Sequence, residues 1–447
     1  MSEEKALQHQ AGTNTLQRGI TKWTLVLMVI NSIIGAGIFG LPSKIFALTG
    51  LYSIAAFFIC AAIVLIFILC FAEVGSRFKT TGGPYTYVLS AFGELPGFAV
   101  GWLLLLSRIF NYATLINLMV TYLSFFSTSF SEPFTRVGII ILVTGLLTYI
   151  NYIGVKNIAA TSNVFTLAKL LALGTFITVG LFFLQADNFT LQQVPSLTSF
   201  STAVLLLVFA FGGFESVVVN TGEINNPSKT IPFGLLTATL VVAIFYILIQ
   251  VTSIGTLPSL ASSEKPLAEA ASVFMGSFGG KFIAAGAVIS ILGTLNILLF
   301  SGSRLPFAFS NEGQFPKIFS KLNAKYKTPT FSLLCVAVIT VIVSIAWSFL
   351  SALTVAVIIR ITVYLFVCAS LIMLRKKMPT QTGFYKIRFG NAVAFTGIMI
   401  SFWLLSAAKL IELRNVAIFL CVGIIIYFLQ RKFNKPTNLP KLPPQDQ

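Results

Sequence analysis

The sequence predicts an all-α membrane protein with about twelve transmembrane helices. Of its 447 residues, 56% are hydrophobic and only 10% are charged, whereas soluble domains are about a quarter charged. The mean hydropathy is +0.91, and apolar runs of about 20 residues, the length needed to cross a bilayer, recur along the whole chain. The predicted spans are 22–48, 51–73, 94–126, 134–154, 160–185, 200–222, 232–257, 281–306, 329–346, 349–374, 391–410 and 413–431.

The placement of charge predicts how these spans are oriented. The net charge of +17 could indicate a nucleic-acid partner, but Lys and Arg gather in alternate loops, as the positive-inside rule describes. We therefore expect a multi-pass protein of the plasma (cell inner) membrane, surrounded by membrane lipid and with no nucleic acid as partner. The polar tails 1–21 and 432–447 are both predicted to be cytoplasmic.

Residue types that support metal, cofactor or covalent chemistry are scarce. The five cysteines lie in apolar runs without paired spacing, which is typical of small buried hydrophobic residues. The single histidine, His9, lies in the N-terminal tail, so no imidazole is available for proton transfer within the spans. The sequence contains no glycine-rich phosphate loop with its lysine and hydroxyl. It thus predicts neither an enzyme, nor a cofactor, nor a metal site.

Two of the spans carry glycines that would interrupt a membrane helix. The first contains GAGIFG, beginning at Gly35, and the sixth contains FGGFE, beginning at Phe211. Interruptions at corresponding positions of two halves are typical of transporters built from inverted repeats, which bind substrate between the broken helices. Close helix packing is the alternative for either cluster alone. We expect a five-plus-five repeat formed by 22–185 and 200–374, followed by two further spans in 391–431.

Six sequence motifs follow one another at the predicted span boundaries. They are GAGIF followed by LP at 35–42, GGPYTY at 82–87, NYIGVK at 151–156, FAFGGFE at 209–215, EINNPSKTIP at 223–232 and SRLPFAFSNEGQFP at 303–316. In this order they resemble the amino acid-polyamine-organocation superfamily, specifically its bacterial amino acid permeases, over nearly the whole chain. The resemblance implies the LeuT-type inverted repeat and an amino acid substrate, or in a minority of relatives a polyamine or organic cation. The spans hold few acidic residues, which favours an amino acid over a polyamine.

The two interruptions offer groups for both charged ends of an amino acid. Where the first span unwinds, the amides of Ala36 and Gly37 can point at the carboxylate, helped by the positive N-terminal end of the next helix. The freed carbonyls of Ile33, Phe209 and Gly212 can accept hydrogen bonds from the ammonium. By resemblance to the permeases, these positions hold the backbone of the amino acid.

Selection of the substrate side chain is expected from residues of the third, sixth and eighth spans. Ser107 and Asn111 are four positions apart and share a helical face, and Asn296 lies in the eighth span. Phe209 matches the aromatic gate over the substrate in the permeases that the sequence resembles. The alternatives are hydrogen bonds between helices for the polar residues and ordinary packing for Phe209. The glycines after Phe209 and the apolar surroundings favour a small or medium neutral side chain.

Ionisable residues inside the spans are candidates for coupling. Lys169 lies about two turns inside the fifth span, and lysine can lose its proton when buried. By the same resemblance, a lysine here stands where sodium-coupled relatives bind their cation. Glu215 can either carry a proton or hold unwound backbone. Arg108 and Arg360 cannot release a proton, and we expect them to pair with carbonyls or acids, or to line water.

The predicted function is a sodium-independent secondary transporter of amino acids that works by alternating access with proton coupling. An amino acid exchanger is the alternative within this class, and a non-transporting amino acid sensor is the alternative outside it. At the predicted cytoplasmic ends, Glu73 with Arg77 and Glu223 with Lys229 are expected to form an inner gate or to be solvated charges. The sequence predicts neither the particular amino acid nor the oligomeric state.

Overall fold

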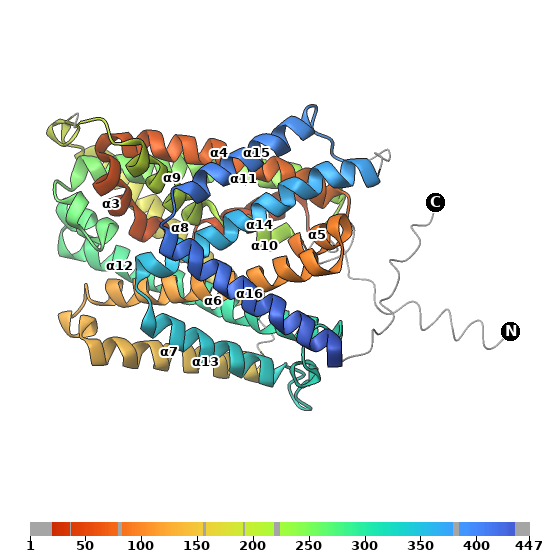
Figure 1. Cartoon of the computed structure of the whole chain (residues 1–447). Helices are drawn as coiled ribbons and strands as arrows, with labels where there is room; N and C mark the ends of the chain where they lie inside the picture. Colours follow the sequence, from red (N-terminus) through yellow and green to blue (C-terminus); the bar gives the residue numbers. More distant parts are fainter. Residues whose placement is uncertain are drawn as a thin grey trace.

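The computed structural model describes residues 20–35, 37–78, 83–154, 158–190, 193–218, 224–378 and 384–433. Within these ranges the chain is helical, and its β structure is an isolated parallel bridge between Ile20 and Ile224. Figure 1 shows a bundle of long helices. The predicted all-α class is therefore confirmed.

Each predicted span overlaps a helix or, for the two interrupted spans, two helices in succession. The α-helices are α2 (Lys22–Ile33), α3 (Gly37–Thr49), α4 (Ser53–Ser76), α5 (Pro84–Phe92), α6 (Glu94–Leu123), α7 (Pro133–Ile153), α8 (Ile158–Gly180), α9 (Leu197–Phe211), α10 (Phe214–Val218), α11 (Pro227–Thr256), α12 (Pro266–Asn311), α13 (Thr330–Ala346), α14 (Phe349–Lys377), α15 (Gly390–Ser406) and α16 (Leu410–Phe433). Short 3-10 turns are η1 (Gly50–Tyr52), η2 (Thr128–Ser131), η3 (Leu181–Phe183), η4 (Ala186–Asn188), η6 (Leu260–Ser262) and η7 (Lys317–Ser320).

Among the described residues, eight helical segments are long and apolar enough to cross a membrane. The chain is thus a multi-pass membrane protein, while twelve as the number of spans and the inverted repeat remain predictions. The eight segments are Gly37–Ser76, Glu94–Leu123, Pro133–Ile153, Leu197–Val217, Pro227–Thr256, Pro266–Asn311, Phe349–Lys377 and Leu410–Lys432. Four shorter apolar helices accompany them: Lys22–Ile33, Lys169–Phe183, Thr330–Ala346 and Gly390–Ser406.

Helix α12 is much longer than the span predicted within it. The prediction covers 281–306, whereas the helix begins at Pro266 and ends at Asn311. At 1.5 Å per residue it would measure roughly 70 Å if straight, more than twice the hydrocarbon thickness of a bilayer. Gly276 has a φ of 68°, a left-handed conformation that glycine adopts without steric cost. This bend separates a short N-terminal segment from the part long enough to span.

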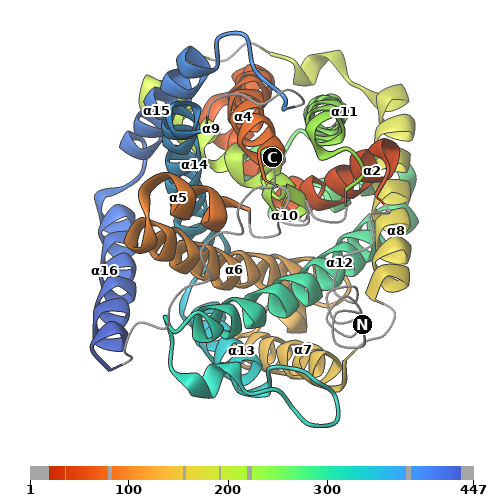
Figure 2. The ribbon, with the colours of Figure 1, turned by 90° about the vertical axis from the view of Figure 1, so that its right-hand side faces the viewer.

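The helices that carry the breaks lie against one another and against the longest helices. In Figure 2, α2, α4, α9, α10 and α11 form one group, and α6 and α12 pass beside it. α11 packs on both α2 and α4, α3 packs on α9, and α6 packs on both α12 and α14. α7 and α13 pack on each other at the edge of the bundle. The breaks therefore lie among helices from both halves of the chain.

Candidate functional site

The first break separates α2 from α3. α2 ends at Ile33, and the amide of Gly35 turns back to the Ile33 carbonyl at 2.6 Å. Ala36, whose amide is predicted to hold the substrate carboxylate, lies outside the described residues. Gly37 begins α3, and a Cβ there would lie 2.9 Å from the ring of Phe209. Glycine at this position lets the two interrupted spans approach each other.

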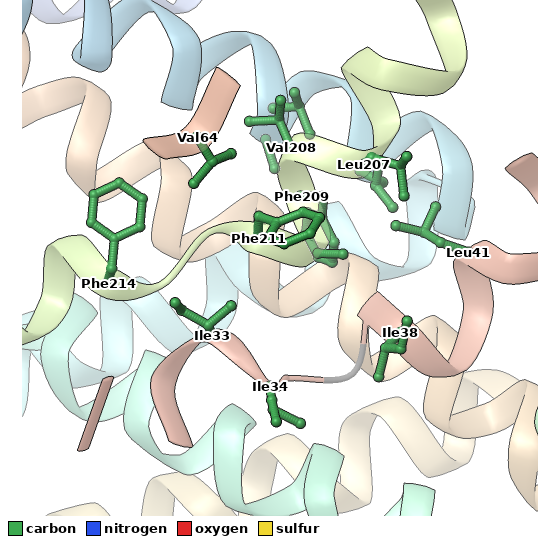
Figure 3. Close-up of a cluster of buried hydrophobic side chains, with 14 of the residues drawn as sticks. Ile33, Ile34, Ile38, Leu41, Val64, Leu207, Val208, Phe209, Phe211 and Phe214 are labelled. Atoms are coloured by element: carbon green, nitrogen blue, oxygen red, sulfur yellow. The ribbon is translucent and has the colours of Figure 1, made fainter. Parts of the chain in front are cut away.

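The second break separates α9 from α10 at Gly212 and Gly213. Gly213 has a φ of 122°, and a Cβ on it would overlap with the backbone carbonyl of Ser32 in α2. The hydroxyl of Ser32 donates a hydrogen bond of 2.7 Å to the Gly213 carbonyl. Figure 3 shows this extended segment passing close to Ile33. The two breaks are therefore in direct contact.

A tyrosine of α11 lies within hydrogen-bond distance of carbonyls from both breaks. The hydroxyl of Tyr246 lies 3.0 Å from the carbonyl oxygen of Ile33 and 3.0 Å from that of Ala210. Its side chain is buried, and a buried phenol usually finds a hydrogen-bond partner. Sequence reasoning missed this residue, although a tyrosine inside an otherwise apolar span is itself a signal.

Arg360 of α14 extends into the second break. Its Nη1 donates to the Phe209 carbonyl at 3.2 Å and its Nη2 donates to Oδ1 of Asn111 at 3.4 Å. Its Nε lies 3.2 Å from Oε1 of Glu215. A Cβ on Gly212 would overlap with the guanidinium, so the glycine makes room for it. The structure thus gives Arg360 the carbonyl and acid partners that the sequence could not name.

Glu215 bonds to the unwound backbone. Its Oε2 accepts a hydrogen bond of 2.8 Å from the amide of Gly213 and one of 3.1 Å from the hydroxyl of Tyr364 in α14. Nearby, Nη1 of Arg108 donates to Oγ of Ser216 at 3.3 Å. These bonds fit the backbone-holding role expected for Glu215, and proton carriage by it remains a prediction.

The polar residues predicted to select the side chain are divided between two places. Asn111 donates from Nδ2 to the carbonyl of Ser107 at 2.6 Å and to its hydroxyl at 2.9 Å. Asn111 also accepts a hydrogen bond from Arg360, so it links Ser107 to Arg360. Oδ1 of Asn296 instead accepts a hydrogen bond of 2.8 Å from Asn151 in α7. Asn296 is thus hydrogen-bonded to α7. The role of Asn296 in substrate binding remains a prediction.

Lys169 lies beside the first break. Its Nζ donates a hydrogen bond of 2.7 Å to the carbonyl of Asn31, in the last turn of α2. Only 4% of its surface is exposed. The amine of Lys169 therefore links α8 directly to α2, the helix that ends at the first break.

Similarity to known proteins identifies the family. Residues 20–428 match a family described as amino acid permease. The chain belongs to the amino acid permease family. Because this family consists of transporters and exchangers, the permease is not an enzyme.

Curated relatives match this permease along almost its whole length. A methylthioribose transporter of Bacillus subtilis (strain 168) is 24% identical, covering 97% of this chain and 98% of its own. A branched-chain amino acid permease of the same organism is 25% identical, covering 95% and 96%. A serine/threonine exchanger, also from that organism, is 26% identical, covering 94% and 98%. The family, the branched-chain amino acid permease and the serine/threonine exchanger support amino acid transport, and symport and antiport both fit them. The family also indicates a multi-pass position in the bacterial inner membrane.

A second charged cluster of this permease lies where α4 and α14 end. Oε1 of Glu73 accepts hydrogen bonds from Arg77 at 2.9 Å and from Arg375 at 2.7 Å. Its Oε2 accepts from Arg375 at 2.6 Å and from the amide of Ile387 at 2.9 Å. Arg77 is the partner expected from the sequence, and Arg375 was missed. Glu223, the other acid of the expected inner gate, lies outside the described residues.

Proposed function

We propose that this permease is a sodium-independent secondary transporter of amino acids that works by alternating access. The observation that most supports it is the direct contact between the two helix breaks, which brings backbone from both halves of the chain to one place. In this proposal 22–185 and 200–374 are inverted repeats, 391–431 adds two spans, and both termini are cytoplasmic.

The backbone of the substrate is held between the breaks. The amide of Gly37, which begins α3, takes the carboxylate together with that of Ala36, the residue before it in the sequence. The carbonyls of Ile33, Phe209 and Gly212 take the ammonium. A carbonyl has two lone pairs, and those of Ile33 and Phe209 each already accept two hydrogen bonds from the protein, so the ammonium takes the place of one of these donors.

Lys169 is the proposed coupling residue. When protonated, its amine holds the Asn31 carbonyl with a charge-assisted hydrogen bond. When the proton leaves, the charge is lost and this link between α8 and α2 weakens. Because α2 ends at the first break, protonation and the geometry of the carboxylate site are physically connected.

A small or medium side chain is proposed for the substrate. The contact of Gly37 with Phe209 leaves little space where the breaks meet. The small or medium size expected from the sequence agrees with this limited space. The neutral charge expected from the sequence was argued without the guanidinium of Arg360, which lies against Gly212.

Uptake by the purified full-length protein in liposomes tests the proposal. Each of the twenty amino acids is offered with and without sodium, with and without an inward proton gradient, and with and without amino acid inside. We expect accumulation that requires the proton gradient and not sodium. Uptake only against internal amino acid would make the protein an exchanger. Absence of uptake and of counterflow for all twenty would contradict transport.

Coupling is tested by Lys169→Ala, with Lys265→Ala as the control. Lys265 donates to the hydroxyl of Ser124 and takes no part in the proposed site. Lys169→Ala is expected to lose accumulation driven by the proton gradient while retaining counterflow, and Lys265→Ala is expected to keep both. Accumulation unchanged in Lys169→Ala would remove this lysine from the mechanism.

A further inference from the structure

The charges at the second break do not balance. Arg108 and Arg360 are permanently charged, and in the described part of the chain Glu215 is the acid that acts on both. Arg360 and Glu215 are only 7% and 6% exposed. Arg108 is partly exposed, so the two cations and one anion leave a surplus positive charge at the edge of a buried region.

Arg360 also lies where a substrate side chain would reach it. Its guanidinium contacts the carbonyl of Phe209, the amide group of Asn111 and the backbone of Gly212. These three residues were assigned to the substrate site from the sequence alone. A ligand held between the breaks would therefore meet Arg360 beyond its own backbone.

The hydrogen bonds of Arg360 leave capacity for a ligand. Its bonds of 3.2 and 3.4 Å to Phe209 and Asn111 go to uncharged acceptors and lie at or beyond the long end of the usual range. Its buried Nε, although near Glu215, makes no aligned hydrogen bond. A guanidinium has five N–H donors in a planar fork that matches a carboxylate.

A carboxylate on the ligand would improve this arrangement in two ways. Its hydrogen bonds to Arg360 would be charge-assisted and about twice as strong as those to neutral acceptors. Its charge would also offset the surplus positive charge, which is costly in a region of low dielectric constant. A neutral side chain provides neither effect.

We propose that Arg360 selects amino acids whose side chain carries a carboxylate, such as aspartate and glutamate. The proposal rests on the amino acid transport proposed above, and it changes the expected side chain from neutral to anionic while keeping its size. The ligand carboxylate replaces Phe209 and Asn111 as acceptors of the Arg360 hydrogen bonds, and Glu215 keeps its place beside Nε. Arg108 keeps the site positive while Glu215 is ionised.

The competing role for Arg360 is to fasten α14 to α10 through Glu215. That role makes no demand on the charge of the substrate. Ligands of equal shape and different charge therefore separate the two roles, and aspartate with asparagine and glutamate with glutamine are such pairs.

The experiment measures half-maximal concentrations for these four amino acids with the full-length protein in liposomes. For the wild type we expect each acid to be favoured over its amide by about tenfold or more, the effect of one charge-assisted hydrogen bond. Arg360→Gln is expected to bring the ratio near one, and Arg360→Lys to retain a preference for the acids. Arg304→Gln, which removes an arginine bonded to the Phe300 carbonyl in α12, is expected to leave the ratio unchanged.

Several outcomes would overturn the proposal. A wild-type protein that takes up asparagine and glutamine as well as the acids, or better, contradicts it. So does uptake of another amino acid with none of these four, or an acid preference that survives in Arg360→Gln. If Arg360→Gln does not fold, the wild-type ratio and Arg360→Lys decide. Absence of uptake for every amino acid instead contradicts the proposed function itself.

Discussion

Two buried glutamates lie beside arginines, Glu73 at the end of α4 and Glu215 at the second break. They differ in how many hydrogen bonds their carboxylates accept. Glu73 accepts four hydrogen bonds of 2.6 to 2.9 Å, and three of them come from guanidinium groups. Glu215 accepts bonds of 2.8 and 3.1 Å from an amide and a phenol, and it faces Arg360 at 3.2 Å without an aligned hydrogen bond. The first carboxylate is saturated and the second is not.

We interpret this difference as a structural role for the first carboxylate and a part in the proposed substrate site for the second. We refer to Glu73, Arg77 and Arg375 as the end cluster and to Arg108, Glu215 and Arg360 as the break cluster. A fully satisfied buried network rigidifies the elements that it joins, and the end cluster joins α4, α14 and the chain before α15. Both clusters hold two arginines and one glutamate, so what distinguishes the break cluster is the hydrogen-bonding capacity that Arg360 retains for a ligand. Substitutions in the two clusters should therefore affect different measurements.

The largest expected effect is on the stability of the end cluster. Glu73→Gln removes the negative charge between the buried guanidinium of Arg77 and the partly buried one of Arg375, and breaking a buried pair in this way costs about 3–5 kcal/mol. Thermal unfolding in detergent measures the loss, with Glu215→Gln as the matched variant. We expect the smaller loss in Glu215→Gln, because Glu215 has fewer ionic bonds to lose. An equal loss in the two variants would contradict the distinction between the clusters.

Substitution of two glycines tests the same distinction between the clusters, with an expected effect of intermediate size. A Cβ on Gly212 would overlap with the guanidinium of Arg360, and one on Gly390 would overlap with that of Arg375. Each guanidinium is the far end of a flexible side chain, so it would move away from the added methyl group and give up hydrogen bonds, each contributing about 1.5–3 kcal/mol for a charged group. Gly390→Ala is expected to lower the unfolding temperature without changing the ratio of acid to amide uptake, and Gly212→Ala to change that ratio. If the ratio changed in Gly390→Ala and not in Gly212→Ala, the acid preference could not be assigned to Arg360.

The smallest expected effect is that of a single phenol. Tyr364→Phe removes the bond of 3.1 Å to Glu215, and a hydrogen bond of this kind contributes about 0.5–1.5 kcal/mol. We expect a loss of stability in that range and weaker binding of the acidic substrates, because Glu215 then draws more strongly on Arg360. Thermal unfolding and the uptake ratio measure the two effects. Tighter binding of the acids would show that Tyr364 and Glu215 do not share the charge in this way.

The fold could be predicted where a local pattern determines it. Apolar runs of sufficient length mark the helices, and the glycine clusters mark the breaks, because both features act within a few residues. The four-residue spacing of Ser107 and Asn111 places them on one face, as their hydrogen bonds show. The early start of α12 was missed because Gly276, Gly279, Gly280 and Lys281 interrupt the apolar pattern where the predicted span begins.

The partners of the site could not be predicted because they are set by tertiary packing. Tyr246 and Ile33 lie 213 positions apart, and a single sequence does not indicate which polar side chains of two spans meet. The direction of Asn296 was equally open, since a helix that is apolar on all sides gives no periodic signal of its inner face. Arg360 and Glu215 could be named as charges inside spans, but their pairing required the structure.

The shared hydroxyl of Tyr246 has a consequence for the reversibility of binding. One hydroxyl carries one proton, so it can serve the carbonyl of Ile33 or that of Ala210, but not both at once. When the ammonium of a substrate takes one of these carbonyls, the proton can turn to the other, and when the substrate leaves it can turn back. Arrival and departure then require rotation about one C–O bond rather than the loss of a buried hydrogen bond. A carrier has to release its cargo as readily as it takes it up, and in the proposed site this hydroxyl keeps a hydrogen bond whether the substrate is present or not.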